Sequence, residues 1–205
     1  MPWTPIVGKS FSPTEFDDYT KKLVWKDWKP QFITIHNTAI PSLAQRPDGF
    51  TRQHILNLES YFKNDRKWSG GPHLFIDDKQ IWVFNPLTLP GVHSPSWNRT
   101  AIGIEMLGDF NKESFTSGRG NLVRLNTIRA VAALNLALGF KPDNWKFHVE
   151  DTRSDHDCPG KNARAERANL VRDITESMTF RFPDKPIKLP PWGLIFDDSE
   201  LAKKG

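Results

Sequence analysis

The chain has 205 residues, of which 38% are hydrophobic and 25% charged, and its formal net charge is +4. This length suffices for one domain with a buried core, and the composition is typical of a soluble globular protein. The basic residues are scattered, and no helix-turn-helix, zinc-finger or RNA-binding signature is present, so we expect no nucleic-acid partner.

The chain has one cysteine, Cys158, so no internal disulfide can form. The opening residues, MPWTPIVGKS, lack the basic end and apolar core of a signal peptide, and no apolar stretch approaches the length of a membrane span. We therefore expect synthesis in the cytoplasm and no insertion into a membrane. Action outside the cell would then need a separate release route, such as a holin.

The first half of the chain predicts one helix, one strand, a second helix and a hairpin. Residues 12–15, SPTE, form a capping-box pattern ahead of a helix. The β-rich run 31–36 predicts a strand that ends at His36, and apolar spacing predicts a helix over 51–64. The runs HLFID and IWVF predict two strands joined by the turn DDKQ.

The second half predicts a strand over 101–107 and a long helix that Gly139 ends. The polar stretch FHVEDTRSDHDCPG follows, and then a final helix over 161–178. Because helices and strands are interleaved along the chain, we expect an α/β layer architecture.

The cysteine lies in the polar stretch, directly before Pro159 and a predicted helix. A thiol ahead of a helix N-terminus is expected to have a lowered pKa, and the thiolate is the form that binds zinc. Together with His148 and His36 it would give a three-ligand zinc site with an open fourth position, as in catalytic zinc sites. The alternative is that Cys158 is a small buried hydrophobic residue.

Glu105 is the second residue with a candidate chemical role. Side chains alternate along a strand, so in AIGIEML Gly103 and Glu105 share the face opposite the apolar residues. Glu105 could act as a general base beside a metal-bound water. It could also be an ordinary solvated carboxylate.

Four segments in order resemble one known family. They are FITIHNTA, GGPHLFID, PGVHSPSWNRTAIGIEM and FHVEDTRSDHDCPGK, which together span roughly residues 30 to 175. Their sequence and spacing are similar to those of the zinc-dependent N-acetylmuramoyl-L-alanine amidases of type 2, which are related to the peptidoglycan recognition proteins. Each motif alone is weak, whereas four in the right order are specific.

The resemblance implies a fold, a metal and a reaction. The fold would be α/β, with a central mixed β-sheet flanked by helices. One Zn²⁺ would be bound by His36, His148 and Cys158, and Glu105 would match the catalytic glutamate. The substrate would be the amide between the lactyl group of N-acetylmuramic acid and L-alanine of the peptidoglycan stem peptide.

The sequence departs from the family pattern at two positions. A lysine commonly lies two residues before the third ligand, and here that residue is His156. We expect His156 to donate a hydrogen bond to the oxyanion, although it could be a solvated loop residue. Some phage members have a catalytic tyrosine where this chain has Pro72. The next residue, His73, is expected to be a satisfied core histidine rather than a support for the site.

The loops that border the groove in the family supply candidate substrate contacts, either by stacking on sugar rings or by hydrogen bonding. These candidates are Asn37, Thr38, His93, Trp97 and Asn98.

We expect a bacteriolytic enzyme, an endolysin of a phage or prophage that acts as a monomer on peptidoglycan or muropeptides. A cytosolic amidase that recycles muropeptides and a non-catalytic peptidoglycan-binding protein remain alternatives. Along the chain we expect a helical lead-in over 1–29, the amidase domain over 30–179, and a proline-rich tail over 180–205 that packs on the domain or extends from it.

Overall fold

The computed structural model describes residues 2–180, and the predicted tail from 181 onward lies outside that range. Within it, six strands form one mixed sheet in the order β1-β4-β3-β5-β2-β6. The four strands β3, β5, β2 and β6 pair in parallel, while β4 and β1 extend the sheet as antiparallel strands. The strands are β1 (Lys9–Phe11), β2 (Phe32–Asn37), β3 (Leu74–Ile76), β4 (Ile81–Val83), β5 (Ala101–Met106) and β6 (Trp145–Phe147).

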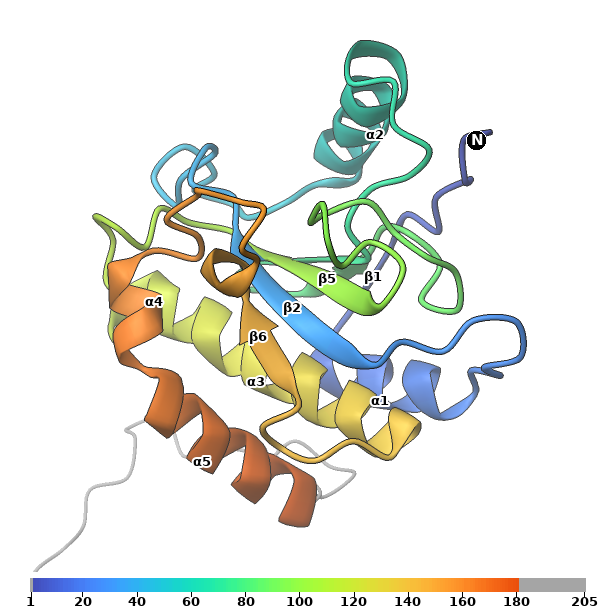
Figure 1. Ribbon diagram of the computed structural model, residues 1–205. Helices are drawn as coiled ribbons and strands as arrows, with labels where there is room; N and C mark the ends of the chain where they lie inside the picture. The colour runs from blue at the N-terminus through green and yellow to red at the C-terminus, as the bar shows by residue number, and fades with distance from the viewer. Residues whose placement is uncertain (1, 181–205) are drawn as a thin grey trace, which may run out of the picture.

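Helices lie on both sides of this sheet (Figure 1). The long α3 covers one face and packs against α1 and α5, whereas α2 lies on the opposite side. The predicted α/β architecture with a central mixed sheet is therefore confirmed. The helices are α1 (Pro13–Lys21), α2 (Arg52–Ser60) continued by the π-helix η1 (Tyr61–Asp65), α3 (Gly118–Leu138), the 3-10 helix η2 (His148–Glu150), α4 (Lys161–Ala165) and α5 (Arg167–Thr179).

The two faces of the sheet differ in chemistry because side chains alternate along each strand. On β5, Ile102, Ile104 and Met106 are fully buried in the core. Gly103 and Glu105 occupy the alternate positions, and the parallel register pairs Glu105 with His36 of β2. The predicted division of β5 into an apolar face and a face that carries Gly103 and Glu105 is thus found. The pairing with β2 places two candidate site residues side by side.

Local signals set several helix ends as predicted. Ser12 and Glu15 form a complete capping box at α1, with Pro13 as its first residue. Gly139 ends α3 in the left-handed conformation, with φ +70°. A second capping box at α2 joins Thr51 to His54.

The strands β1 and β6 were not predicted. Each has three residues, which is too short for alternation to be recognised in a sequence. Because β1 pairs with β4, the N-terminal segment is part of the sheet rather than only a helical lead-in.

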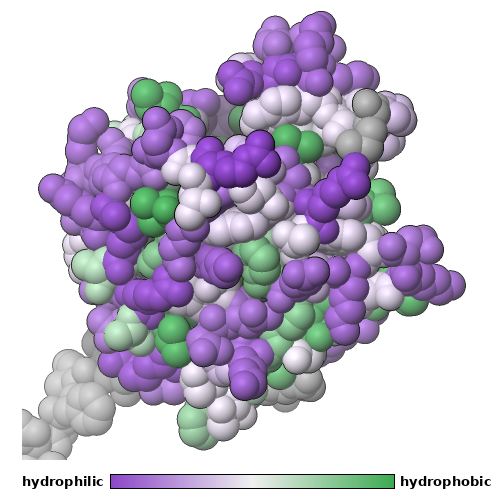
Figure 2. Space-filling view, viewed as in Figure 1, coloured by the Kyte–Doolittle hydropathy of each residue, from purple (hydrophilic) through white to green (hydrophobic). Residues whose placement is uncertain are grey.

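The molecular surface has no large apolar region in the view of Figure 2, where hydrophobic residues appear as small separate patches. Among residues 2–180, no helix combines the length and the apolar character needed to cross a membrane.

Candidate metal centre and substrate cavity

Three donor side chains from distant parts of the sequence converge at one end of the sheet. His36, His148 and Cys158 each offer a ligand atom, and these atoms all lie within 4.8 Å of one another. His36 comes from the C-terminal end of β2, and His148 directly follows β6, which pairs in parallel with β2. Parallel pairing brings the ends of the two strands to the same edge, so the topology itself brings the two imidazoles together.

Backbone hydrogen bonds fix the third donor against the other two. The amide N–H of Val149 donates to the carbonyl oxygen of Cys158 at 2.9 Å. The amide N–H of Asn37 donates to Cys158 Sγ at 3.3 Å. The loop that carries the thiol is thus attached both to η2 and to the end of β2, next to both histidines.

The pKa of the Cys158 thiol is shifted in the opposite direction from the one predicted. Burial raises the pKa of Cys158 well above its ordinary value, with a further contribution from Glu105, and the hydrogen bond from Asn37 opposes this only in part. The predicted lowering by the following helix is wrong for the metal-free site, because burial outweighs any effect of the five-residue helix α4. A bound divalent cation would supply the charge that favours the thiolate.

The two imidazoles are in the neutral form that binds metals. Burial lowers the pKa of His36 well below its ordinary value, and the neighbouring histidines lower it further. Burial also lowers the pKa of His148, followed by the effect of His156. His148 Nε2 is buried and has no hydrogen-bond partner among residues 2–180. This unpaired nitrogen, together with a thiol and a second imidazole, fits the nitrogen and sulfur ligands that zinc prefers.

Glu105 lies beside these donors. Its Oε1 atom is 3.9 Å from His36 Nδ1, and the side chain is 18% exposed. Burial raises the pKa of Glu105 to about 8. A carboxyl group with a pKa near neutrality can both accept and return a proton, which is what a general base and acid requires.

The opposite side of the His36 ring contacts a second buried histidine. His36 Nε2 and His93 Nδ1 are 3.1 Å apart, and His93 Nε2 is 3.1 Å from the carbonyl oxygen of Ala101. Burial lowers the pKa of His93 to about 3. Because Nε2 of His36 contacts His93, Nδ1, which is near Glu105, is the nitrogen left available to bind a metal.

A cavity of about 360 Å³ begins at Glu105 and extends towards α2 and η1. Its walls include Phe50, Phe62 and Phe75, together with the predicted contact residues Asn37 and Thr38. The mixture of aromatic walls and a few polar groups is typical of a ligand site. The cavity therefore places a substrate-sized space directly beside the candidate base.

The other three predicted substrate contacts lie away from this cavity. His93 is buried behind His36. The Trp97 ring packs edge-on against Phe32, at the far end of β2 from His36, and Lys146 lies over it. Asn98 Oδ1 accepts hydrogen bonds from the backbone N–H groups of His93 and Ser94, at 2.7 and 2.8 Å. In the structure these residues shape the 93–98 loop.

His156 is exposed in the loop before Cys158, and its ring centroid is 5.6 Å from that of His148. The adjacent Asp157 forms an ion pair with Arg164 of α4 at 2.5 Å. His156 is therefore near the three donors but on their solvent side. His73, in contrast, is fully buried with both ring nitrogens hydrogen-bonded, as expected of a core histidine.

Sequence reasoning missed Asp151, which anchors the loop containing His148. Burial opposes its ionisation, but hydrogen bonds from Ser94 and Ser96 and from the Arg153 amide hold the pKa of this carboxyl well below its ordinary value. The His148 loop is thereby joined to the 93–98 loop. A carboxylate in a run of polar residues gave no signal that separates it from its exposed neighbours.

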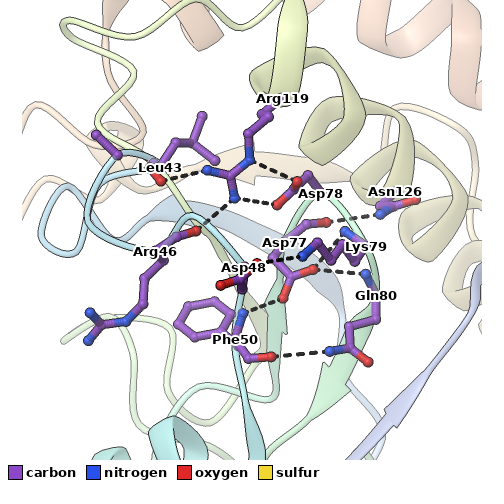
Figure 3. A network of polar contacts seen from close by, with 12 residues as sticks. Leu43, Arg46, Asp48, Phe50, Asp77, Asp78, Lys79, Gln80, Arg119 and Asn126 are labelled. Carbon is purple, nitrogen blue, oxygen red and sulfur yellow. Dashed lines mark hydrogen bonds and ion pairs between the residues drawn. The ribbon is translucent and has the colours of Figure 1, made fainter.

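A second polar network, also missed, holds the segment that contains Arg46 and Phe50, two residues that line the cavity. Figure 3 shows this network. Arg119 at the start of α3 makes two hydrogen bonds to the carboxylate of Asp78, at 2.7 and 2.8 Å. The same guanidinium donates to the carbonyl oxygens of Leu43 and Arg46, at 2.6 and 2.7 Å. Next to it, buried Asp77 accepts the amide N–H of Phe50 at 2.7 Å. The network thus ties the loop that borders the cavity to α3 and to the β3–β4 hairpin.

Known proteins share this fold and this arrangement of segments. An endolysin N-acetylmuramoyl-L-alanine amidase, LysCS from Clostridium intestinale, is 25% identical, with a TM-score of 0.53 over 73% of this chain and 91% of that one. A mutant of Drosophila PGRP-LB in complex with tracheal cytotoxin is 18% identical, with a TM-score of 0.56 over 71% of this chain and 85% of that one. Peptidoglycan-recognition protein SC2 of Drosophila simulans is 20% identical over 64% of this chain and 68% of its own length.

The family model described as N-acetylmuramoyl-L-alanine amidase, Amidase_2, matches residues 26–161. That match covers β2 to the start of α4 and includes Glu105 and the three candidate metal ligands. The resemblance inferred from four short motifs is confirmed, and the chain belongs to the N-acetylmuramoyl-L-alanine amidase family.

Proposed function

We propose that the protein is a zinc-dependent amidase that cuts peptidoglycan between the lactyl group of N-acetylmuramic acid and L-alanine, and that it acts as an endolysin. One observation carries the proposal. Three donors suited to zinc lie within 4.8 Å of one another, with Glu105 beside His36 and at the edge of the cavity. His36, His148 and Cys158 would hold a single zinc ion.

The ion, when bound, supplies a Lewis acid that polarises the lactyl carbonyl and makes water more acidic. Glu105 accepts a proton from the attacking water and returns it to the leaving nitrogen of alanine. The amide C–N bond breaks, the lactyl carbon keeps the oxygen of water as a carboxylate, and the stem peptide leaves with a free amino terminus. The raised pKa of Glu105 describes the metal-free protein. A bound cation would favour the carboxylate, which is the form that accepts the proton from water.

His156 is proposed as the hydrogen-bond donor to the developing oxyanion, in the place where many relatives have lysine. Its position beside His148, on the solvent side of the donors, supports this role. Such a donor contributes about 10²-fold or more to turnover. Replacement by alanine is therefore expected to lower turnover by roughly that factor while zinc remains bound, and an unchanged rate would exclude the role.

Asn37 and Thr38 are proposed as substrate contacts because both line the cavity. Each also has a structural hydrogen bond: Asn37 Nδ2 donates to the carbonyl oxygen of Gly108, and Thr38 Oγ1 to that of Pro41. His93, Trp97 and Asn98 are not proposed as contacts, given their positions away from the cavity.

The experiment that tests the activity is a digest of purified sacculi with zinc-loaded protein, with chelator-treated protein, and with the Glu105→Gln variant. We expect new amino-terminal alanine without new reducing sugar ends, and only from the zinc-loaded wild type. New reducing ends would indicate a glycosidase. Binding to sacculi without release of alanine would support a peptidoglycan-binding protein instead.

The same assay on small anhydro-muropeptides separates the two enzyme roles. An endolysin is expected to clear intact sacculi efficiently, whereas a recycling amidase would prefer the small soluble fragments. Sedimentation analysis tests the proposed monomer. Expression with and without a co-expressed holin tests the proposed release from the cytoplasm, since lysis is expected only when both are present.

A further inference from the structure

A chain of hydrogen bonds ends on the ring nitrogen of His36 that faces away from the metal centre. A carbonyl oxygen only accepts hydrogen bonds, so the contact between His93 Nε2 and the Ala101 oxygen at 3.1 Å requires the proton of His93 to be on Nε2. Burial lowers the pKa of His93 to about 3, so the ring is neutral and its Nδ1 is a bare acceptor. His36 Nε2, 3.1 Å away, must be the donor, which leaves Nδ1 of His36 without a proton.

We propose that His93 is a positioning residue that holds His36 in the tautomer whose unprotonated Nδ1 faces the metal centre. The proposal rests on the proposed metal centre for its purpose, but the tautomer itself is a property of the metal-free protein. A ligand histidine commonly donates its second N–H to a carboxylate or a carbonyl group. Here a second imidazole stands between the ligand and the backbone carbonyl.

The surroundings of His93 hold its ring in one orientation. A Cβ atom at Gly103 would lie 2.3 Å from His93 Cγ, so only glycine on β5 leaves room for the ring. The backbone N–H of His93 donates to Asn98 Oδ1 at 2.7 Å, which fixes the start of the 93–98 loop. Gly103 and Asn98 thus acquire a role through His93, although neither touches the candidate metal position.

His73 offers a matched control in the same part of the fold. It is also a buried imidazole with two hydrogen bonds: Nε2 donates to the Leu89 oxygen, and Nδ1 accepts the N–H of Gly103, both at 2.9 Å. Its ring stacks on Trp28 and is a neighbour of His93. None of its hydrogen bonds involves a candidate ligand. Loss of His73 therefore reports the cost of removing a buried histidine that lies next to His93 but is not hydrogen-bonded to a candidate ligand.

The first test measures the tautomers directly in metal-free protein. Long-range proton–nitrogen NMR correlations of ¹⁵N-histidine-labelled protein distinguish the two neutral forms of each ring. We expect both His36 and His93 to carry the proton on Nε2, and His36 to lose this preference in the His93→Phe variant. A proton on Nδ1 of His36 in the wild type would overturn the proposal, whether or not the protein binds zinc.

The second test measures zinc affinity by competition with a chromophoric chelator for the wild type and three variants. We expect His93→Phe to weaken binding about tenfold or more, a typical loss when a partner of a metal ligand is removed. His93→Asn should retain part of the zinc affinity that His93→Phe loses, because the amide oxygen of asparagine can accept a hydrogen bond from His36. His73→Phe should lower the melting temperature but not the zinc affinity.

Equal zinc affinities for wild type and His93→Phe would overturn the proposal while leaving the metal centre intact. Equal losses of zinc affinity in His93→Phe and His73→Phe would also overturn the proposal, because such losses would reflect packing rather than the tautomer of His36. Failure of the wild type to bind zinc would instead count against the proposed function. If His93→Phe does not fold, His93→Asn and the wild-type NMR measurement still decide the question.

Discussion

The two sides of the cavity are built from different kinds of polar interaction. On the metal side, neutral imidazoles are linked to one another and to a backbone carbonyl, and burial opposes the ionisation of Cys158 and Glu105. On the other side, Arg119 and Asp78 carry full charges and are hydrogen-bonded to each other. The metal side has an unpaired buried nitrogen on His148, and the arginine side has its acceptors in place. The difference separates a site prepared for a cation from a network whose central guanidinium, that of Arg119, is already paired.

Replacement of Cys158 by alanine should have the largest effect and should be confined to the metal side. The variant loses the only sulfur ligand, so amidase activity should fall to background and zinc should no longer raise the melting temperature. The wild type should gain about 2.7 kcal/mol of stability at a zinc concentration 100 times the dissociation constant. The metal-free variant should differ from metal-free wild type by no more than about 1 kcal/mol, because an uncharged thiol is lost. Calorimetry with and without zinc measures both quantities.

Glu105→Gln should leave zinc affinity within a few-fold of wild type but lower turnover by about 10²- to 10⁴-fold, the usual contribution of a general base. Turnover on sacculi, measured alongside zinc content, checks this. A variant with normal turnover would remove Glu105 from the mechanism. A variant without zinc would mean that Glu105 acts through the metal centre.

The same variant tests the pKa of Glu105 in metal-free protein. The folded pKa of about 8 lies above the unfolded value near 4.3, so the folded state binds more protons between these values and stability falls as the pH rises from about 4.3 to 8. The loss should be roughly 3–5 kcal/mol and should be absent from Glu105→Gln. Urea unfolding of metal-free wild type and metal-free Glu105→Gln across this pH range isolates the contribution of Glu105. The depressed pKa values of the buried histidines affect the stability of both proteins equally. Bound zinc should abolish the difference, because a cation favours the carboxylate.

The residues that could be predicted from the sequence are those with a local signal. A strand ending in histidine, a strand with glycine and glutamate on one face, and the only cysteine each stood out from their neighbours. The sheet brings the histidine and the glutamate together, because β2 and β5 pair in parallel with His36 opposite Glu105. Hydrogen bonds from Val149 and Asn37 hold the cysteine beside them. The α/β architecture followed from interleaved periodicities of the same kind.

What could not be predicted depends on contacts between distant segments. His93 was expected to touch substrate because it lies in a loop that borders the groove in the family. Nothing in the sequence indicates that its ring packs over Gly103 of a neighbouring strand. Arg119 and Asp78 are 41 positions apart, and nothing in either segment marks them as partners. The predicted pKa shift of Cys158 was wrong for a related reason, since burial outweighs the local effect of a short helix.

Arg119→Lys should damage the arginine side and leave the metal side unchanged, the converse of Cys158→Ala. Lysine cannot make the two parallel hydrogen bonds to Asp78 or reach both carbonyl oxygens. Since Asp78 is nearly buried and Arg119 is partly exposed, we expect metal-free stability to fall by about 1–3 kcal/mol, with a raised KM and unchanged zinc affinity.

Lys79→Ala is the matched control for that change. Lys79 lies in the same network, but its ammonium group is half exposed and pairs only weakly with exposed Asp48, at 3.5 Å. The free energy of unfolding should change by no more than about 0.5 kcal/mol. A loss as large as that of Arg119→Lys would mean that general charge, and not the bidentate contact, stabilises the loop.

Ile40→Ser should give only a small effect and should act on the substrate alone. Ile40 lines the cavity yet is 82% exposed, an arrangement that contributes little to the folded core. Stability should therefore change by no more than about 0.5 kcal/mol, and zinc affinity should be unaffected. The KM for muropeptides should rise a few-fold, because apolar area that the substrate would cover is lost. A kinetic comparison with wild type on one soluble muropeptide measures this, and an unchanged KM would place the substrate elsewhere along the cavity.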